Sequence, residues 1–125
     1  MQIDIKGKGA VGIAISYYSL RGMVSIPLEP CDYNLIYDNG EFLLKIKVIS
    51  CSYKTKYGVY AASIRTSGGN QPNSCVKKFS SNSCDGVFIV TPELDMYEIP
   101  SFEITCARQI SLSVYGKYKV SLIPG

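Results

Sequence analysis

The chain has 125 residues, a formal net charge of +3 and 46% hydrophobic residues. This length suits one domain over residues 1–125, and the charge permits a polyanionic partner without requiring one. The absence of histidine excludes Ser–His and Cys–His catalysis and removes the commonest zinc ligand. Five widely spaced cysteines form no Cys-x-x-Cys pair, which disfavours a zinc site: Cys31, Cys51, Cys75, Cys84 and Cys106.

The sequence also predicts where the protein works. No run of apolar residues is long enough to span a bilayer, so we expect no membrane partner. The first nine residues contain several polar positions and lack the apolar core of a signal peptide. We therefore expect a cytoplasmic protein whose cysteines are reduced.

The first predicted element is a helix over residues 10–21. Its apolar residues recur at helical spacing, at Val11, Ala14, Ile15 and Tyr18. Gly22 follows at the position where a helix often ends in a left-handed glycine. A short strand is predicted over residues 23–28, with Pro27 marking its end.

A β-hairpin over residues 34–50 follows, because Asp38-Asn39-Gly40 is a strong hairpin-turn signal. The second strand alternates, and its predicted core face carries Phe42, Leu44, Ile46 and Val48. The opposite face carries Leu43, Lys45, Lys47 and Ile49. Either this second face is an ordinary solvated face or it is a binding site.

The second half of the chain is mostly β-structure. A long polar stretch over residues 67–85 separates the strands, and a turn at residues 92–95 joins two of them. The predicted strands cover residues 59–66, 87–91 and 96–99, with weaker segments at 104–114 and 119–123. The expected fold class is therefore α+β: an N-terminal helix on a mixed sheet with β-hairpins.

Several motifs follow one another in an informative order. They are Tyr33-Asn34-Leu35-Ile36, Lys45-Ile46-Lys47-Val48-Ile49-Ser50, Ile64-Arg65-Thr66-Ser67, and the apolar strands with their Pro92-Glu93 turn over residues 85–100. In this order they resemble the PD-(D/E)XK nuclease superfamily, and within it the small homing endonucleases associated with cyanobacterial group I introns. The resemblance covers roughly residues 6–100 and implies a restriction-endonuclease-like core.

In that family, carboxylates hold Mg²⁺, which activates water against the scissile phosphate, and a lysine assists. The resemblance places the four catalytic positions at Val11, Asn34, Lys47 and Ile49, and all four are substituted here. An amide binds Mg²⁺ less well than a carboxylate, and a lysine about 4 Å from a cation costs about 1 to 4 kcal/mol. Ile49 cannot transfer a proton. We therefore expect no metal cofactor and no phosphodiester hydrolysis.

Three functions remain open from the sequence. The first is binding of double-stranded DNA by basic residues, which could equally be scattered solvated charges: Lys45, Lys47, Lys54, Lys56, Arg65, Lys77 and Lys78. The second is an active Mg²⁺-dependent endonuclease with migrated ligands, Asp32 and Asp85, with Asp38 and Glu41 nearby. The third is a structural or self-assembling protein, because ten tyrosines favour interfaces. Related nucleases cut both strands as symmetric oligomers, so a homodimer or homotetramer is expected.

Overall fold

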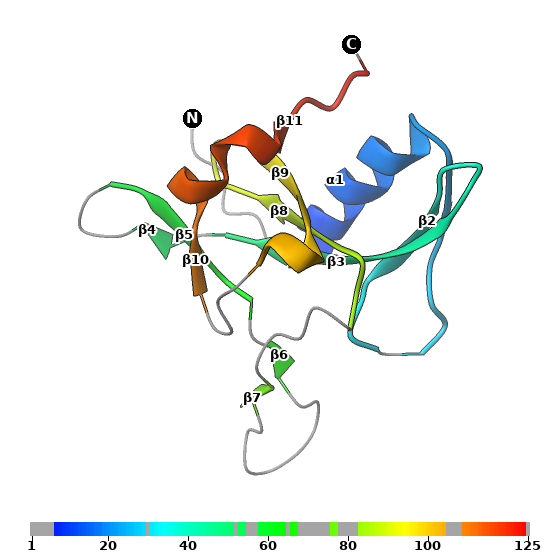
Figure 1. The fold of residues 1–125 in the computed structure, drawn as a ribbon, viewed down its shortest axis with the longest axis horizontal. Coiled ribbons are helices and arrows are strands. Elements are labelled where there is room, and N and C mark those ends of the chain that lie inside the picture. Colours follow the sequence, from blue (N-terminus) through cyan, green and yellow to red (C-terminus); the bar gives the residue numbers. More distant parts are fainter. Residues whose placement is uncertain are drawn as a thin grey trace.

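The computed structural model describes residues 7–29, 31–51, 53–54, 58–64, 66–67, 76–77, 83–104 and 109–124. The fold is α+β, as predicted, with one α-helix, α1 (Gly7–Ser19), among the described residues (Figure 1). Two short 3₁₀ helices, η1 (Ser101–Glu103) and η2 (Leu112–Tyr118), follow in the C-terminal part. No described helix combines the length and the apolar character needed to cross a bilayer.

The central sheet has six strands in the order β1-β2-β3-β8-β9-β11. Their bounds are β1 (Met23–Ser25), β2 (Leu35–Asp38), β3 (Leu43–Ser50), β8 (Gly86–Val90), β9 (Met96–Pro100) and β11 (Lys119–Val120). Strands β3 and β8 pair in parallel, and their neighbours in the sheet pair antiparallel. The predicted mixed sheet is thus confirmed.

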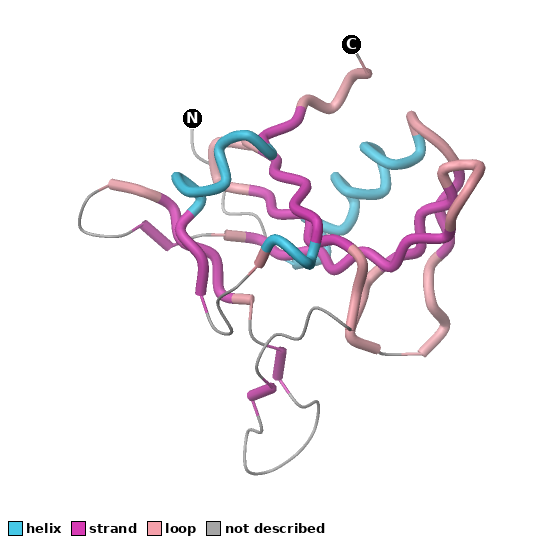
Figure 2. The backbone as a smooth tube through the Cα atoms, viewed as in Figure 1, coloured by secondary structure: helices cyan, strands magenta, loops and turns pink. Residues whose placement is uncertain are grey.

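Two smaller sheets complete the described strands. One joins β4 (Tyr53–Lys54), β5 (Tyr60–Ser63) and β10 (Gln109–Ser111), and the other joins β6 (Thr66–Ser67) and β7 (Val76–Lys77). Figure 1 shows β4, β5 and β10 on the opposite side of the molecule from the β2–β3 hairpin. The same arrangement of helices, strands and loops can be followed along the backbone in Figure 2.

The central sheet is covered on both faces. On one face, buried residues of α1 pack on Leu35, Ile46, Phe88 and Val90. On the other face, Val87, Ile89 and Ile99 pack against residues of β5, β10 and η2. All five residues of β8 are buried, which explains why this strand reads as an uninterrupted apolar run.

The observed helix α1 differs from the predicted helix at both ends. It begins at Gly7 instead of residue 10 and ends at Ser19, although Gly9 and Gly12 lower its intrinsic stability. Tertiary packing explains this, because Ala10 and Ala14 are completely buried against the sheet. Among the described residues, positive φ angles occur at glycines 40 and 58 and at Leu94, so the left-handed role predicted for Gly22 is wrong.

The hairpin turn is confirmed, but one assignment on its second strand is wrong. Gly40 has a φ of 97°, and its N–H donates to Asp38 Oδ1 at 2.9 Å. Phe42 lies before β3 and is 64% exposed, so it does not face the core as predicted. Leu44, Ile46 and Val48 do pack on the α1 side.

The opposite face of β3 is not simply solvated. Ile49 packs against the core that lies between the sheet and β5, β10 and η2, and Lys47 is half-buried. This covering comes from segments far along the chain, which local alternation cannot predict.

Of the remaining predicted strands, those over residues 87–91 and 96–99 are observed as β8 and β9, and three others are shorter in the structure. Residues 23–28 contribute only β1, residues 59–66 contribute β5 with Thr66 in β6, and residues 119–123 contribute only β11. The weak segment at 104–114 contains β10 followed by the start of η2. Within the long stretch over 67–85, β6 ends at Ser67, β7 spans Val76–Lys77, and residues 83–85 are described; the rest lies outside the described residues.

Candidate nucleic-acid interface on strand β3

The structure brings three of the four family positions together. Asn34 lies one position before the Leu35–Ile46 pair of β2 and β3, and therefore opposite Lys47. Its N–H donates to the Ile46 carbonyl at 2.8 Å. Lys47 and Ile49 alternate with the residues facing α1, so both lie on the other face of β3.

The Asn34 side chain already has a structural role. Its Oδ1 accepts a hydrogen bond of 2.7 Å from the Val48 N–H. The amide thereby extends the pairing of β2 with β3 beyond Leu35, the first residue of β2. This oxygen is turned towards the backbone, so one of its lone pairs is already used.

Lys47 is a partly desolvated cation on this face. Burial lowers the pKa of its ammonium group, while the nearby Cys84 and Asp32 act in the opposite direction. Cys84 is 3% exposed and directly precedes the Asp85 turn into β8. Lys47 therefore places a positive charge at a position where the sequence resemblance predicted a polar residue beside a metal.

Lys45 is the exposed cation of the same face. Its Nζ lies 5.4 Å from the centre of the Tyr33 ring. The Lys45 N–H donates to Asp85 Oδ2 at 2.7 Å, and the Asp85 N–H donates to the Lys45 carbonyl at 2.8 Å. We call Tyr33, Asn34, Lys45 and Lys47 the β3 basic face.

The donor set of this site does not fit a divalent cation. Asp85 Oδ2 and Asn34 Oδ1 both accept backbone hydrogen bonds. Across the described ranges, no three His, Cys, Asp or Glu residues gather in a way that could hold a metal ion. Val11 lies half-buried on α1, whose core residues pack on the opposite face of the sheet. Mg²⁺ prefers several free carboxylate oxygens, which these residues do not offer.

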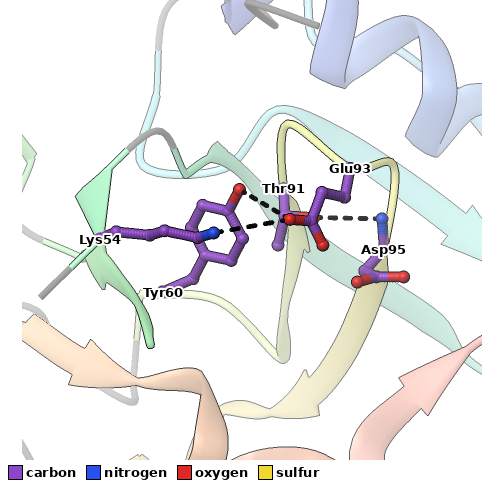
Figure 3. A network of polar contacts seen from close by, with 5 residues as sticks. All are labelled: Lys54, Tyr60, Thr91, Glu93 and Asp95. Atoms are coloured by element: carbon purple, nitrogen blue, oxygen red, sulfur yellow. Dashed lines mark hydrogen bonds and ion pairs between the residues drawn. The ribbon is translucent and has the colours of Figure 1, made fainter. Parts of the chain in front are cut away.

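Lys54 belongs to a different part of the molecule. Figure 3 shows it beside Tyr60, with both side chains directed at Glu93 in the turn after β8. Lys54 Nζ lies 3.6 Å from Glu93 Oε1, and the Tyr60 hydroxyl donates to the same oxygen at 3.4 Å. The carboxylate offsets the charge of Lys54, so this lysine is not equivalent to Lys45.

The structure describes the other predicted basic residues only in part. Lys77 lies in β7, where the structure describes the strand and not the side chain. The remaining three, Lys56, Arg65 and Lys78, lie outside the described residues. Sequence reasoning missed Tyr33, because it lies in the loop before β2 where no alternation marks its direction.

Neither a family model nor a curated protein sequence matches the chain. Among solved structures, the bacterial homing endonuclease I-Ssp6803I matches with a TM-score of 0.72 and 27% sequence identity. The match covers 86% of this chain and 75% of that chain. The chain is homing-endonuclease-like in fold.

A weaker likeness relates the chain to MepB, with a TM-score of 0.46 and 14% identity over 92% of this chain and 95% of that chain. The homing-endonuclease-like fold confirms the resemblance that the order of motifs predicted. It also agrees with the α+β class and the mixed sheet predicted from the sequence.

Proposed function

We propose that this chain is a homing-endonuclease-like domain that binds double-stranded DNA through the β3 basic face and does not hydrolyse it. One observation supports the proposal: the ammonium group of Lys47 and the hydrogen-bonded amide of Asn34 lie opposite each other on β3 and β2, at positions where the sequence resemblance predicts groups of a metal site. A protein with this role would act in the cytoplasm, where exposed thiols such as Cys31 stay reduced.

The chemistry of the face favours a phosphate over a metal. Replacing an aspartate by Asn34 removes an anion that would repel a DNA phosphate, and Lys45 and Lys47 add two cations that attract it. Tyr33 beside Lys45 can contact a sugar or donate its hydroxyl to a phosphate oxygen. Ile49 has no group that could accept or donate a proton at the scissile bond.

The binding experiment is a titration of a fluorescent DNA duplex by the full chain, followed by anisotropy at several salt concentrations. We expect the affinity to fall with salt, and Lys45→Gln to reduce the salt slope by about 0.9, the value for one phosphate contact. The matched control is Lys54→Gln, because Glu93 already offsets that charge. An affinity that does not depend on salt, or equal effects of the two variants, would contradict the proposal.

The cleavage experiment separates the proposal from the active alternative, in which Asp32 and Asp85 hold Mg²⁺. We expect no nicking of a supercoiled plasmid with Mg²⁺ or Mn²⁺. Nicking that disappears in Asp32→Ala would establish the alternative instead. A purely structural role predicts that the duplex does not bind even at low salt.

A further inference from the structure

A cavity of about 500 Å³ is lined mainly by residues of the α1 face of the sheet, together with Asp85, Ile99 and Tyr118. Its walls include side chains from β2, β3, β9 and η2: Tyr37, Leu44, Ile46, Glu98, Pro100 and Tyr118. Tyr37, Leu44 and Ile46 also pack with the residues of α1, which places the cavity beside the helix. Its volume falls within the range of about 300 to 1,000 Å³ typical of small-molecule sites.

Gly86 keeps the floor of this cavity open. It pairs with Ile46 of β3 and with Pro100 of β9, both of which line the cavity. A Cβ atom at Gly86 would lie 3.3 Å from Ile46 Cδ1, which is a tight contact. The absence of a side chain at this strand position therefore leaves space next to the sheet.

The polar side of the cavity is anionic. Among the described residues, its lining includes Glu98 and Asp85 and no lysine or arginine, while Lys117 Nζ lies 5.1 Å from the centre of the ring of the lining residue Tyr118. Asp85 is engaged with the Lys45 N–H, whereas Glu98 accepts a long hydrogen bond of 3.3 Å from the Tyr17 hydroxyl and interacts with the Tyr18 hydroxyl nearby. Glu98 is half-buried, so its charge is less screened than that of a surface carboxylate.

A buried hydroxyl beside the cavity points to an incomplete polar network. Tyr18 is completely buried, and its Oη has no hydrogen-bond partner in the part of the chain that the structure describes. The ring of Tyr18 lies 4.7 Å from that of Tyr37, which lines the cavity. Burial first, and the Glu98 carboxylate next, raise the pKa of Tyr18, so the hydroxyl lies within the field of Glu98. Tyr18 does not itself line the cavity, so its hydroxyl adds polarity beside Glu98 and is not a contact for a ligand.

We propose that this cavity binds a small organic cation with a guanidinium or alkylammonium head. The head would lie against the Glu98 carboxylate and the ring of Tyr37, and the alkyl chain would lie along Leu44 and Pro100. The same carboxylates disfavour a phosphate, so this site is separate from the DNA-binding face. It adds a second ligand class to the proposed function.

The test compares butylguanidinium with butylurea, which has nearly the same size and shape and no charge. Both are titrated into the full chain and followed by amide chemical shifts. We expect saturable binding of butylguanidinium, with shifts centred on Gly86 and Glu98, and at least about tenfold weaker binding of butylurea. Equal binding of the two compounds, or no saturation by butylguanidinium, would overturn the proposal.

Two variants locate the charge that is responsible. Glu98→Gln keeps an acceptor for Tyr17 and removes the anion, so butylguanidinium should bind about tenfold more weakly. Glu41→Gln, an exposed carboxylate in the hairpin turn, is the matched control and should bind as the unmodified chain does. If Glu98→Gln does not fold, the comparison of the two compounds on the unmodified chain still decides the outcome.

One more titration distinguishes an arginine side chain of a peptide from a free small cation as the occupant of the cavity. N-acetylarginine amide presents the same guanidinium as part of a peptide. Tighter binding of this compound than of butylguanidinium would identify an arginine side chain as the natural occupant, and weaker binding would identify a free small molecule.

Discussion

At the scale of single residues, Asn34 shows that a structural hydrogen bond does not fix the charge of the side chain that accepts it. Its backbone and its side chain both bind β3, through the Ile46 carbonyl and the Val48 N–H. Either an aspartate or an asparagine can accept the second of these bonds, because both have the required oxygen. A neutral or a negatively charged side chain can therefore fill this role in the hairpin.

This reasoning predicts the stability of two Asn34 variants. Asn34→Leu leaves the Val48 N–H without its acceptor and should lower the free energy of unfolding by about 1 kcal/mol. Asn34→Asp retains the acceptor and should stay within about 0.5 kcal/mol of the unmodified chain. Urea unfolding followed by circular dichroism measures both, and equal losses in the two variants would show that the hydrogen bond is unimportant.

Titration of Tyr17 makes the stability of the protein depend on pH in the alkaline range. Burial, assisted by the Glu98 carboxylate, raises the pKa of Tyr17 from 10.0 to about 12. The folded state therefore holds this proton more tightly than the unfolded state does. The contribution of Tyr17 to stability is complete below pH 10 and is lost as the pH rises to about 12.

Tyr17→Phe should make this loss of stability shallower. The free energy of unfolding, measured in urea at pH 9.5 and pH 11.5, should fall less between the two pH values in the variant than in the unmodified chain. A part of the fall should remain, because the pKa of Tyr18 is also raised. An identical fall in both proteins would contradict the assignment to Tyr17.

At the scale of elements, α1 and the strand after it use glycines for different reasons. Gly12 lies on the exposed side of the helix, and a Cβ atom there would meet nothing within 4 Å. Gly22 precedes β1, and a Cβ atom there would collide with the Asp38 carbonyl oxygen and lie 2.9 Å from the Tyr37 ring. The first glycine only weakens the helix, whereas the second permits the close approach of β1 to β2.

The two glycines therefore predict opposite effects of the same substitution. Gly12→Ala should raise the free energy of unfolding by about 0.5 to 1 kcal/mol, since alanine is the better helix former. Gly22→Ala should lower it by about 1 to 3 kcal/mol, because the contact involves backbone that must shift. Thermal unfolding of both variants provides the measurement, and a stabilised Gly22→Ala would refute the close-approach argument.

At the scale of the whole molecule, one face of the outer strands remains partly uncovered. Met23 pairs with Asp38 across β1 and β2, and Asp38 pairs with Leu43 across β2 and β3, so Met23 and Leu43 share a face. These two side chains are 73% and 69% exposed. Apolar side chains exposed together on one sheet face are typical of an interface.

We therefore expect self-association through this face. Light scattering of the full chain should give twice the 13.7 kDa chain mass for a homodimer, or four times that mass for a homotetramer. Leu43→Lys should shift the mass towards the monomer, while Leu94→Lys, a 45% exposed leucine in the turn before β9, should not. A monomer at all concentrations would contradict the expected assembly.

The order of the elements was predictable from short-range patterns. Asp38-Asn39-Gly40 predicted the turn, because its conformation depends on the turn residues themselves. The apolar run in residues 87–91 predicted a strand, and the structure shows β8 buried on both faces. Both features depend on residues that are adjacent in the sequence, so the sequence alone predicts where they lie.

The burial of the β3 face and the cavity were decided by tertiary structure. Lys47 and Ile49 alternate like solvated residues, yet segments from β5 to η2, later in the chain, supply the core that Ile49 packs against. The bond from the Val48 N–H to Asn34, and the meeting of Glu98 with Tyr17 of α1, likewise join residues that no local pattern connects. The sequence by itself determined which elements form and in what order, whereas folding determined which charges became buried, because burial depends on what packs against them.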